Sequence, residues 1–165
     1  MNRSLLLIIP LSLTLALIQT AFFSRITFLG HIPQLIVLSV VAWAMLRNLT
    51  EGFVWALIGG LFLDLFSVAP LGTSALGLMA AAGLAYAARQ VLPRGQFVVP
   101  ALLGTLCAAV YLGITLGLAR LSGFSTATDV LDRLISYMIL HALLMIPVYW
   151  LYVWVVRLLF PEPIE

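Results

Sequence analysis

The chain has 165 residues, of which 64% are hydrophobic and only 8% charged, and its mean hydropathy is +1.18. Such a small number of charged side chains cannot cover the surface of a soluble protein. The composition therefore indicates an integral membrane protein. All eight basic residues are arginines spread along the chain, and a net charge of +2 is too dispersed for a nucleic-acid interface. The single cysteine, Cys107, excludes an internal disulfide.

Six apolar stretches predict six helices, at residues 4–23, 33–46, 52–69, 73–88, 96–119 and 128–160. Because about 20 apolar residues cross the hydrocarbon core, we expect an all-α, polytopic membrane protein in which residues 1–165 form one compact bundle of six transmembrane helices. The second and fourth stretches are shorter than a full span, which predicts tilt or local thinning. The last apolar run begins at 134, and a Thr126-x-x-Asp129 capping pattern extends the helix toward residue 128.

The arginines predict the orientation of the bundle. With six spans, five lie on one side, namely Arg3, Arg47, Arg89, Arg94 and Arg157, and three on the other, namely Arg25, Arg120 and Arg133. Positive charge favours the cytoplasmic side, so both termini are expected there. An aromatic cluster before the last arginine is typical of an interfacial belt: Tyr149, Trp150, Tyr152 and Trp154. The first stretch lacks a cleavage site, so we expect an uncleaved helix.

Small residues recur every four positions in three of the predicted helices. Such stripes permit close approach of membrane helices, so they predict packing seams. The first stripe has Gly59 beside it and consists of Gly52, Ala56, Gly60 and Asp64. The second is Gly77, Ala81 and Ala85, and the third is Ala101, Thr105, Ala109, Gly113 and Gly117. We therefore expect the third to fifth helices to pack intimately, with the first and sixth facing lipid or a partner.

Asp64 is the one acidic residue in the middle of the long apolar run 52–69. A carboxylate at that depth must face protein or water, so it marks a functional or a packing site. We favour a structural role in which Asp64 accepts hydrogen bonds from a neighbouring helix, and on that view Asp64→Asn should be nearly silent. An ion relay is the alternative, and it would need a second ionisable group such as His141, with Tyr137 one turn before it.

Motifs for catalysis or metal binding are missing from the sequence. No His, Asp and Glu cluster has ligand spacing, no phosphate-binding loop is present, and the lack of lysine removes Schiff-base chemistry. Glu51, Asp129 and Asp132 sit at predicted helix starts, where the helix dipole favours acidic side chains, and Thr50 could cap the helix that Glu51 opens. We therefore predict a protein that is not an enzyme and has no cofactor and no metal.

The amino-acid sequence around Asp64 is the most specific feature of the chain. Gly60 to Asp64 form a Gly-x-x-x-Asp core that is followed by Pro70, Leu71 and Gly72, while Pro33, Gln34 and Leu35 open the second helix. In this order, and in a chain of this length, these motifs resemble the MreD family of rod shape-determining membrane proteins. That family is similar in fold to the substrate-binding S components of energy-coupling-factor transporters.

The resemblance implies a non-enzymatic component of the bacterial cell-elongation complex in the cytoplasmic (inner) membrane. Such a protein would bind MreC, lie with MreB, RodA and its transpeptidase among membrane lipid, and help to position lateral peptidoglycan synthesis and maintain rod shape. We expect MreC to contact the short second helix, which Pro33 opens, and the outer first loop with Phe28 and Leu29. The alternatives are a vitamin-binding S component, which would hold its ligand between the outer loops, and a channel that would use Asp64 and His141.

Overall fold

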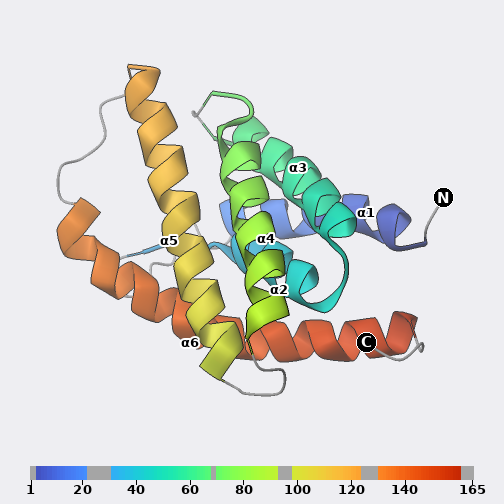
Figure 1. The fold of residues 1–165 in the computed structure, drawn as a ribbon. Coiled ribbons are helices and arrows are strands. Elements are labelled where there is room, and N and C mark those ends of the chain that lie inside the picture. Colours follow the sequence, from blue (N-terminus) through green and yellow to red (C-terminus); the bar gives the residue numbers. More distant parts are fainter. Residues whose placement is uncertain (1–2, 22–30, 68–69, 93–97, 124–129, 161–165) are drawn as a thin grey trace.

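The structure is a computed structural model, and it describes residues 3–21, 31–67, 70–92, 98–123 and 130–160. Within these ranges it is all-helical, as predicted, with six helices (Figure 1). They are α1 (Arg3–Ala21), α2 (Leu35–Leu46), α3 (Leu49–Leu65), α4 (Thr73–Val91), α5 (Val98–Leu121) and α6 (Val130–Leu159).

The largest difference from the predicted helix ends concerns α3, which begins at Leu49 and ends at Leu65 instead of spanning 52–69. Its N-cap is Asn48, whose side-chain oxygen accepts the backbone N–H of Glu51 at 2.8 Å, so the prediction that Thr50 caps this helix is wrong. Asn is among the best N-cap residues because its oxygen satisfies a free helix N–H. The predicted Thr126–Asp129 cap of the last helix lies outside the described residues.

Two helical segments in the described ranges are long and apolar enough to cross a membrane by themselves, namely Val98–Leu121 and Leu134–Leu159. Two others, Ile8–Ala21 and Leu35–Leu46, are apolar but shorter. A full crossing takes about 20 apolar residues. The six-span arrangement is therefore not confirmed by helix length and composition.

The short helix α2 lies at the centre of the bundle. It packs against all five other helices, and every residue from Ile36 to Ala44 is buried. This burial does not support the predicted contact of α2 with a partner, because the helix has almost no free surface. Pro33, which precedes it, is also fully buried. A helix that is apolar all round suits either a lipid-facing or a core position, so the sequence could not separate the two.

The other helices are arranged around α2. Along one side α4 lies between α3 and α5 and packs against both, while α1 packs on α3 and α6 packs on α5. Figure 1 shows α6 running across the direction of α4 and α5. The expected intimate packing of the third to fifth helices is thus correct for α3 with α4 and for α4 with α5.

Two of the three predicted small-residue seams are close contacts. A Cβ atom added at Gly60 would lie 2.3 Å from the Ala75 Cα atom, so the backbones of α3 and α4 touch there. On α4, the buried Gly77 meets the Tyr111 ring of α5, whose Cδ2 atom would lie 2.9 Å from an added Cβ. These distances leave no room for a side chain, which is why both positions are glycine.

The third predicted seam, on α5, is wrong. Gly113 and Gly117 are exposed, with no atom within 4 Å of an added Cβ. The face of α5 that points inward instead carries Pro100, Leu103, Gly104, Cys107, Ala108 and Tyr111. Small residues on a lipid-facing surface carry little penalty, so a four-residue spacing does not by itself tell which face is buried.

The predicted aromatic belt near the end of α6 is divided between surface and core. Trp150 and Trp154 are exposed, as an interfacial belt requires. Tyr152 is instead buried, and its ring packs edge-on against Trp55 and Trp43 with centroid distances of 5.5 and 6.1 Å. These aromatic contacts connect α6 with α2 and α3.

Candidate functional site

Asp64, the residue at the centre of the sequence motif, lies near the end of α3 with only 2% of its surface exposed. Its Oδ2 atom accepts the Gly72 N–H at 2.7 Å, and the Ser74 N–H is shared between Oδ1 at 3.0 Å and Oδ2 at 3.2 Å. The two donors are the N-cap of α4 and a residue of its first turn, where helix N–H groups lack intrahelical partners. Asp64 thus caps α4 from the neighbouring helix.

The turn that enters α4 explains the rest of the motif. Gly72 is the N-cap and has φ +93°, a backbone conformation that favours glycine, and it has no side chain with which to cap the helix. The carboxylate of Asp64 replaces that missing cap and places its negative charge at the positive end of the helix. Pro70 accepts hydrogen bonds from the backbone N–H and the hydroxyl of Thr73 at 3.2 and 2.7 Å, which closes the turn.

The hydrogen bonds of Asp64 predict the effect of its substitution. Asp64→Asn retains one acceptor oxygen for two backbone donors and loses the charge, so we expect a loss of about 1–2 kcal/mol in the free energy of unfolding, a typical value for a lost helix cap. This replaces the nearly silent effect expected from the sequence alone. Asp64→Leu leaves both N–H groups unpaired and should be worse. Thermal unfolding in detergent measures the order, and an Asn variant that is as stable as the native protein but inactive in maintaining cell shape would instead favour an ion relay.

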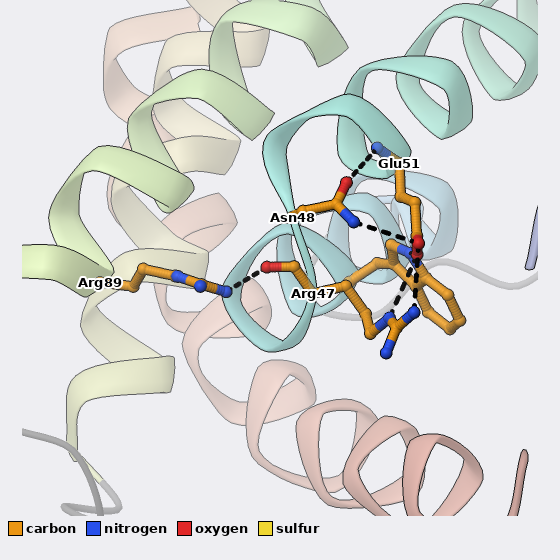
Figure 2. Close-up of polar contacts among 5 residues, drawn as sticks. Arg47, Asn48, Glu51 and Arg89 are labelled. Carbon is orange, nitrogen blue, oxygen red and sulfur yellow. Dashed lines mark hydrogen bonds and ion pairs between the residues drawn. The ribbon is translucent and has the colours of Figure 1, made fainter. Parts of the chain in front are cut away.

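A second polar cluster lies at the turn between α2 and α3, and Figure 2 shows it. Its centre is Glu51, which is 3% exposed. The carboxylate accepts hydrogen bonds from the Arg47 guanidinium at 3.2 Å through both oxygens, from Asn48 Nδ2 at 3.2 Å and from the Trp43 indole N–H at 3.0 Å. Asn48 caps α3 through its side-chain oxygen, and its side-chain amide in turn donates to Glu51, so the two residues bond reciprocally at the start of the helix.

Arginine side chains extend this cluster to other helices. Arg89 of α4 donates a hydrogen bond to the carbonyl oxygen of Met45, at 3.0 Å. It donates a second one to the carbonyl oxygen of Arg47 at the carboxyl end of α2, which Figure 2 shows. An arginine at the carboxyl end of a helix donates to backbone carbonyl oxygens that lack intrahelical partners, and its positive charge complements the helix dipole. The Arg47 guanidinium also stacks over the Phe160 ring, 4.1 Å from its centroid, directly after α6. The cluster therefore joins α2, α3, α4 and the end of α6.

A third polar cluster joins α1, α2 and α6. Gln19 donates to the Gln34 side-chain oxygen at 2.7 Å and accepts the backbone N–H of Ile36 at 3.2 Å. The backbone N–H of Gln34 donates to His141 Nε2 at 3.3 Å, and His141 Nδ1 lies 2.8 Å from the Tyr137 carbonyl oxygen. Gln19 and His141 are both buried. The start of α2 is thus held by α1 and α6, the first and the last helix of the chain.

These contacts favour one tautomer of a neutral His141 ring. Its Nε2 atom accepts from a backbone N–H, so the proton of a neutral ring belongs on Nδ1, where the Tyr137 carbonyl accepts it. A second proton would remove the acceptor that Gln34 uses. Within the described part of the chain, no hydrogen bond joins His141 to Asp64, and each of the two side chains bonds to different backbone groups. The geometry is that of a hydrogen-bonded interior histidine.

The other residues that the sequence predicted as site residues lie outside the three polar clusters. Gly52, Ala56 and Gly59 are buried on the inner face of α3. Leu71 is 69% exposed in the turn before α4. Phe28 and Leu29 lie outside the described residues. Among the side chains that the structure describes, no group of three His, Cys, Asp or Glu lies close enough together to hold a metal ion.

The Glu51 cluster is the part of the site that sequence reasoning missed, because Glu51 was assigned only to a helix start. Two spacings could have revealed it. Arg47 and Glu51 are four residues apart, and Asn48 and Glu51 are three apart, which are ion-pair and capping-box spacings. Trp43 could not have been added from spacing alone, since it lies on the preceding helix.

All three clusters connect helices to one another, and each uses hydrogen bonds to backbone groups. Together with the apolar composition and the long helices α5 and α6, they define a helical membrane protein whose buried polar residues hold the bundle together. The family model for the rod shape-determining protein MreD matches residues 1–155 of the chain. The chain therefore belongs to the MreD family, a structural family of the shape-determining system. No curated protein and no solved structure matches it.

Proposed function

We propose that this protein is a non-enzymatic component of the cell-elongation complex that binds MreC and helps to position lateral peptidoglycan synthesis. The observation that carries this proposal is the match to the MreD family over residues 1–155. MreB, RodA and its transpeptidase would belong to the wider complex. The Gly60–Asp64 motif and its partner turn at Pro70, Leu71 and Gly72 would serve by fixing α3 against α4, so that the bundle offers its partner one defined surface.

The described surface is suited to contact with other helices or lipid. Large apolar side chains are exposed along α5, including Leu102 and Leu106, and along α6, including Leu143 and Leu151. Membrane helices associate by close packing and polar contacts because lipid is as apolar as leucine. A partner helix therefore needs a rigid surface of defined shape, and the three polar clusters would supply that rigidity.

The first test of the proposal is co-purification with MreC. We still place the contact at the outer first loop, so the double variant Phe28→Ala and Leu29→Ala should reduce MreC recovery from detergent-solubilised membranes at least several-fold. The matched control is Leu121→Ala, an 86% exposed leucine at the end of α5 that we expect on the same side of the membrane. Unchanged recovery with the double variant would refute this contact, and failure of the native protein to retain MreC would refute the proposed function.

We further propose a six-span topology with both termini and the 89–95 loop in the cytoplasm. The arginine distribution supports it. Single cysteines at Arg94 and at Ser24, on a Cys107→Ser background, can be treated with a thiol reagent that does not cross the membrane. In intact spheroplasts we expect labelling at position 24 and none at 94, with labelling at 94 only after lysis. Labelling of position 94 in intact spheroplasts would overturn the orientation.

A further inference from the structure

Two polar atoms at the start of α2 are buried and have no hydrogen-bond partner. They are His31 Nε2 and the Tyr137 hydroxyl. Tyr137 is only 4% exposed, and its ring packs edge-on against the His31 ring with a centroid distance of 5.5 Å. The two rings are thus in contact, while neither polar atom bonds to the other.

Two nearby polar side chains of the described chain, His141 and Gln19, already have hydrogen-bond partners. Both nitrogens of His141, whose ring lies 4.1 Å from that of Tyr137, already bond to backbone groups. The side-chain oxygen and nitrogen of Gln19 are likewise occupied by Ile36 and Gln34. More than nine in ten buried polar groups in proteins have a partner, because an unpaired one keeps its full desolvation penalty. Among the residues that the structure describes, His31 Nε2 and the Tyr137 hydroxyl are thus left without a partner.

We propose that a small uncharged hydroxyl-bearing ligand, either a water molecule or a hydroxyl group of a small neutral molecule, binds between His31 Nε2 and the Tyr137 hydroxyl. A hydroxyl both donates and accepts, so it can satisfy both atoms in either tautomer of His31. The described polar groups named here are amides, a phenol and imidazole rings, and none of them is a carboxylate. A cationic ligand would therefore lack a counter-charge among them. The inference goes beyond the proposed function, since MreC binding does not depend on it.

The test begins with Tyr137→Phe, which retains the ring and its packing but removes the hydroxyl. If the hydroxyl is bonded to a ligand, its removal should lower Tm by about 2 °C or more. If it is unpaired, its removal relieves a penalty and Tm should stay the same or rise. The matched control is Tyr111→Phe, because the Tyr111 hydroxyl has a visible partner, Ser74 Oγ at 3.3 Å, and calibrates the loss of one satisfied hydroxyl. An unchanged or higher Tm for Tyr137→Phe overturns the proposal.

A double-mutant cycle tests whether one ligand bridges the two atoms. The His31 and Tyr137 rings contact one another, and such a contact can itself couple two substitutions. Because His31→Phe and Tyr137→Phe both keep an aromatic ring, a ligand held by both polar atoms should appear as a double variant that loses clearly less Tm than the sum of the two single changes. Additive changes overturn the proposal. Mass spectrometry of an organic extract then separates the two sources. A neutral compound retained by the native protein and lost from Tyr137→Phe identifies a small molecule, whereas non-additivity without such a compound identifies water.

Discussion

Placing even an alanine at Gly60 is expected to disrupt the contact between α3 and α4. The new Cβ atom would lie 2.3 Å from the Cα and 2.5 Å from the backbone nitrogen of Ala75, and backbone atoms cannot move aside as the tip of a flexible side chain can. Overpacking typically costs about 1–3 kcal/mol and occasionally more. We expect Gly60→Ala to lie at the upper end of that range, near 3 kcal/mol, and Gly60→Leu to yield no folded protein.

The control for Gly60 is on α5. Gly113 is also a helical glycine, but it is exposed and has no atom within 4 Å of an added Cβ. Alanine is the better helix former by up to about 1 kcal/mol, so Gly113→Ala should leave stability unchanged or raise it. Thermal unfolding in detergent and the yield of monodisperse protein provide the measurement. Equal Tm values for Gly60→Ala and Gly113→Ala would show that the helices do not touch at Gly60.

The contrast between these two glycines shows what the sequence can and cannot predict. Both occur in stripes of small residues with a four-residue period, and the period correctly places each residue on one helical face. Whether that face meets a helix or lipid depends on the other helices. Lipid tails are as apolar as a protein core, so the difference in polarity that orients a helix in a soluble protein is absent. For the same reason the central position of α2 could not be predicted.

Buried polar residues were more predictable than helix faces, because an unpaired polar group inside a membrane is costly wherever it lies. That argument identified Asp64 and His141 from the sequence, and both are buried and fully hydrogen-bonded to backbone groups. It did not identify which groups they contact. Asp64 bonds to a turn eight to ten residues away, whereas His141 bonds to Gln34 from across the bundle.

Glu51→Ala is expected to be the most damaging substitution of a charged side chain in the described part of the protein. It removes the acceptor for the Trp43 indole N–H and for the Arg47 guanidinium at once. Trp43 is 2% exposed, so water cannot replace the lost partner. Breaking a buried ion pair from one side typically costs about 3–5 kcal/mol. The Arg47 side chain keeps 28% of its surface exposed and can be solvated in part, so we expect the lower end, about 3 kcal/mol.

Glu51→Gln separates the contribution of the hydrogen bond from Trp43 from that of the ion pair with Arg47. The amide keeps one oxygen that can accept from Trp43, but its NH₂ group would face the donors of Arg47. We therefore expect a Tm between those of the native protein and Glu51→Ala, while Thr50→Ala, at the exposed neighbouring position, serves as the control and should change little. Because the carboxylate side chain is only 4% exposed, raising the salt concentration should barely alter the difference in Tm between the native protein and the Glu51→Gln variant. If Glu51→Ala and Thr50→Ala unfold at the same temperature, or if salt removes the effect, then Glu51 acts as a surface charge near a helix start and not as the buried acceptor that connects α2 to α3.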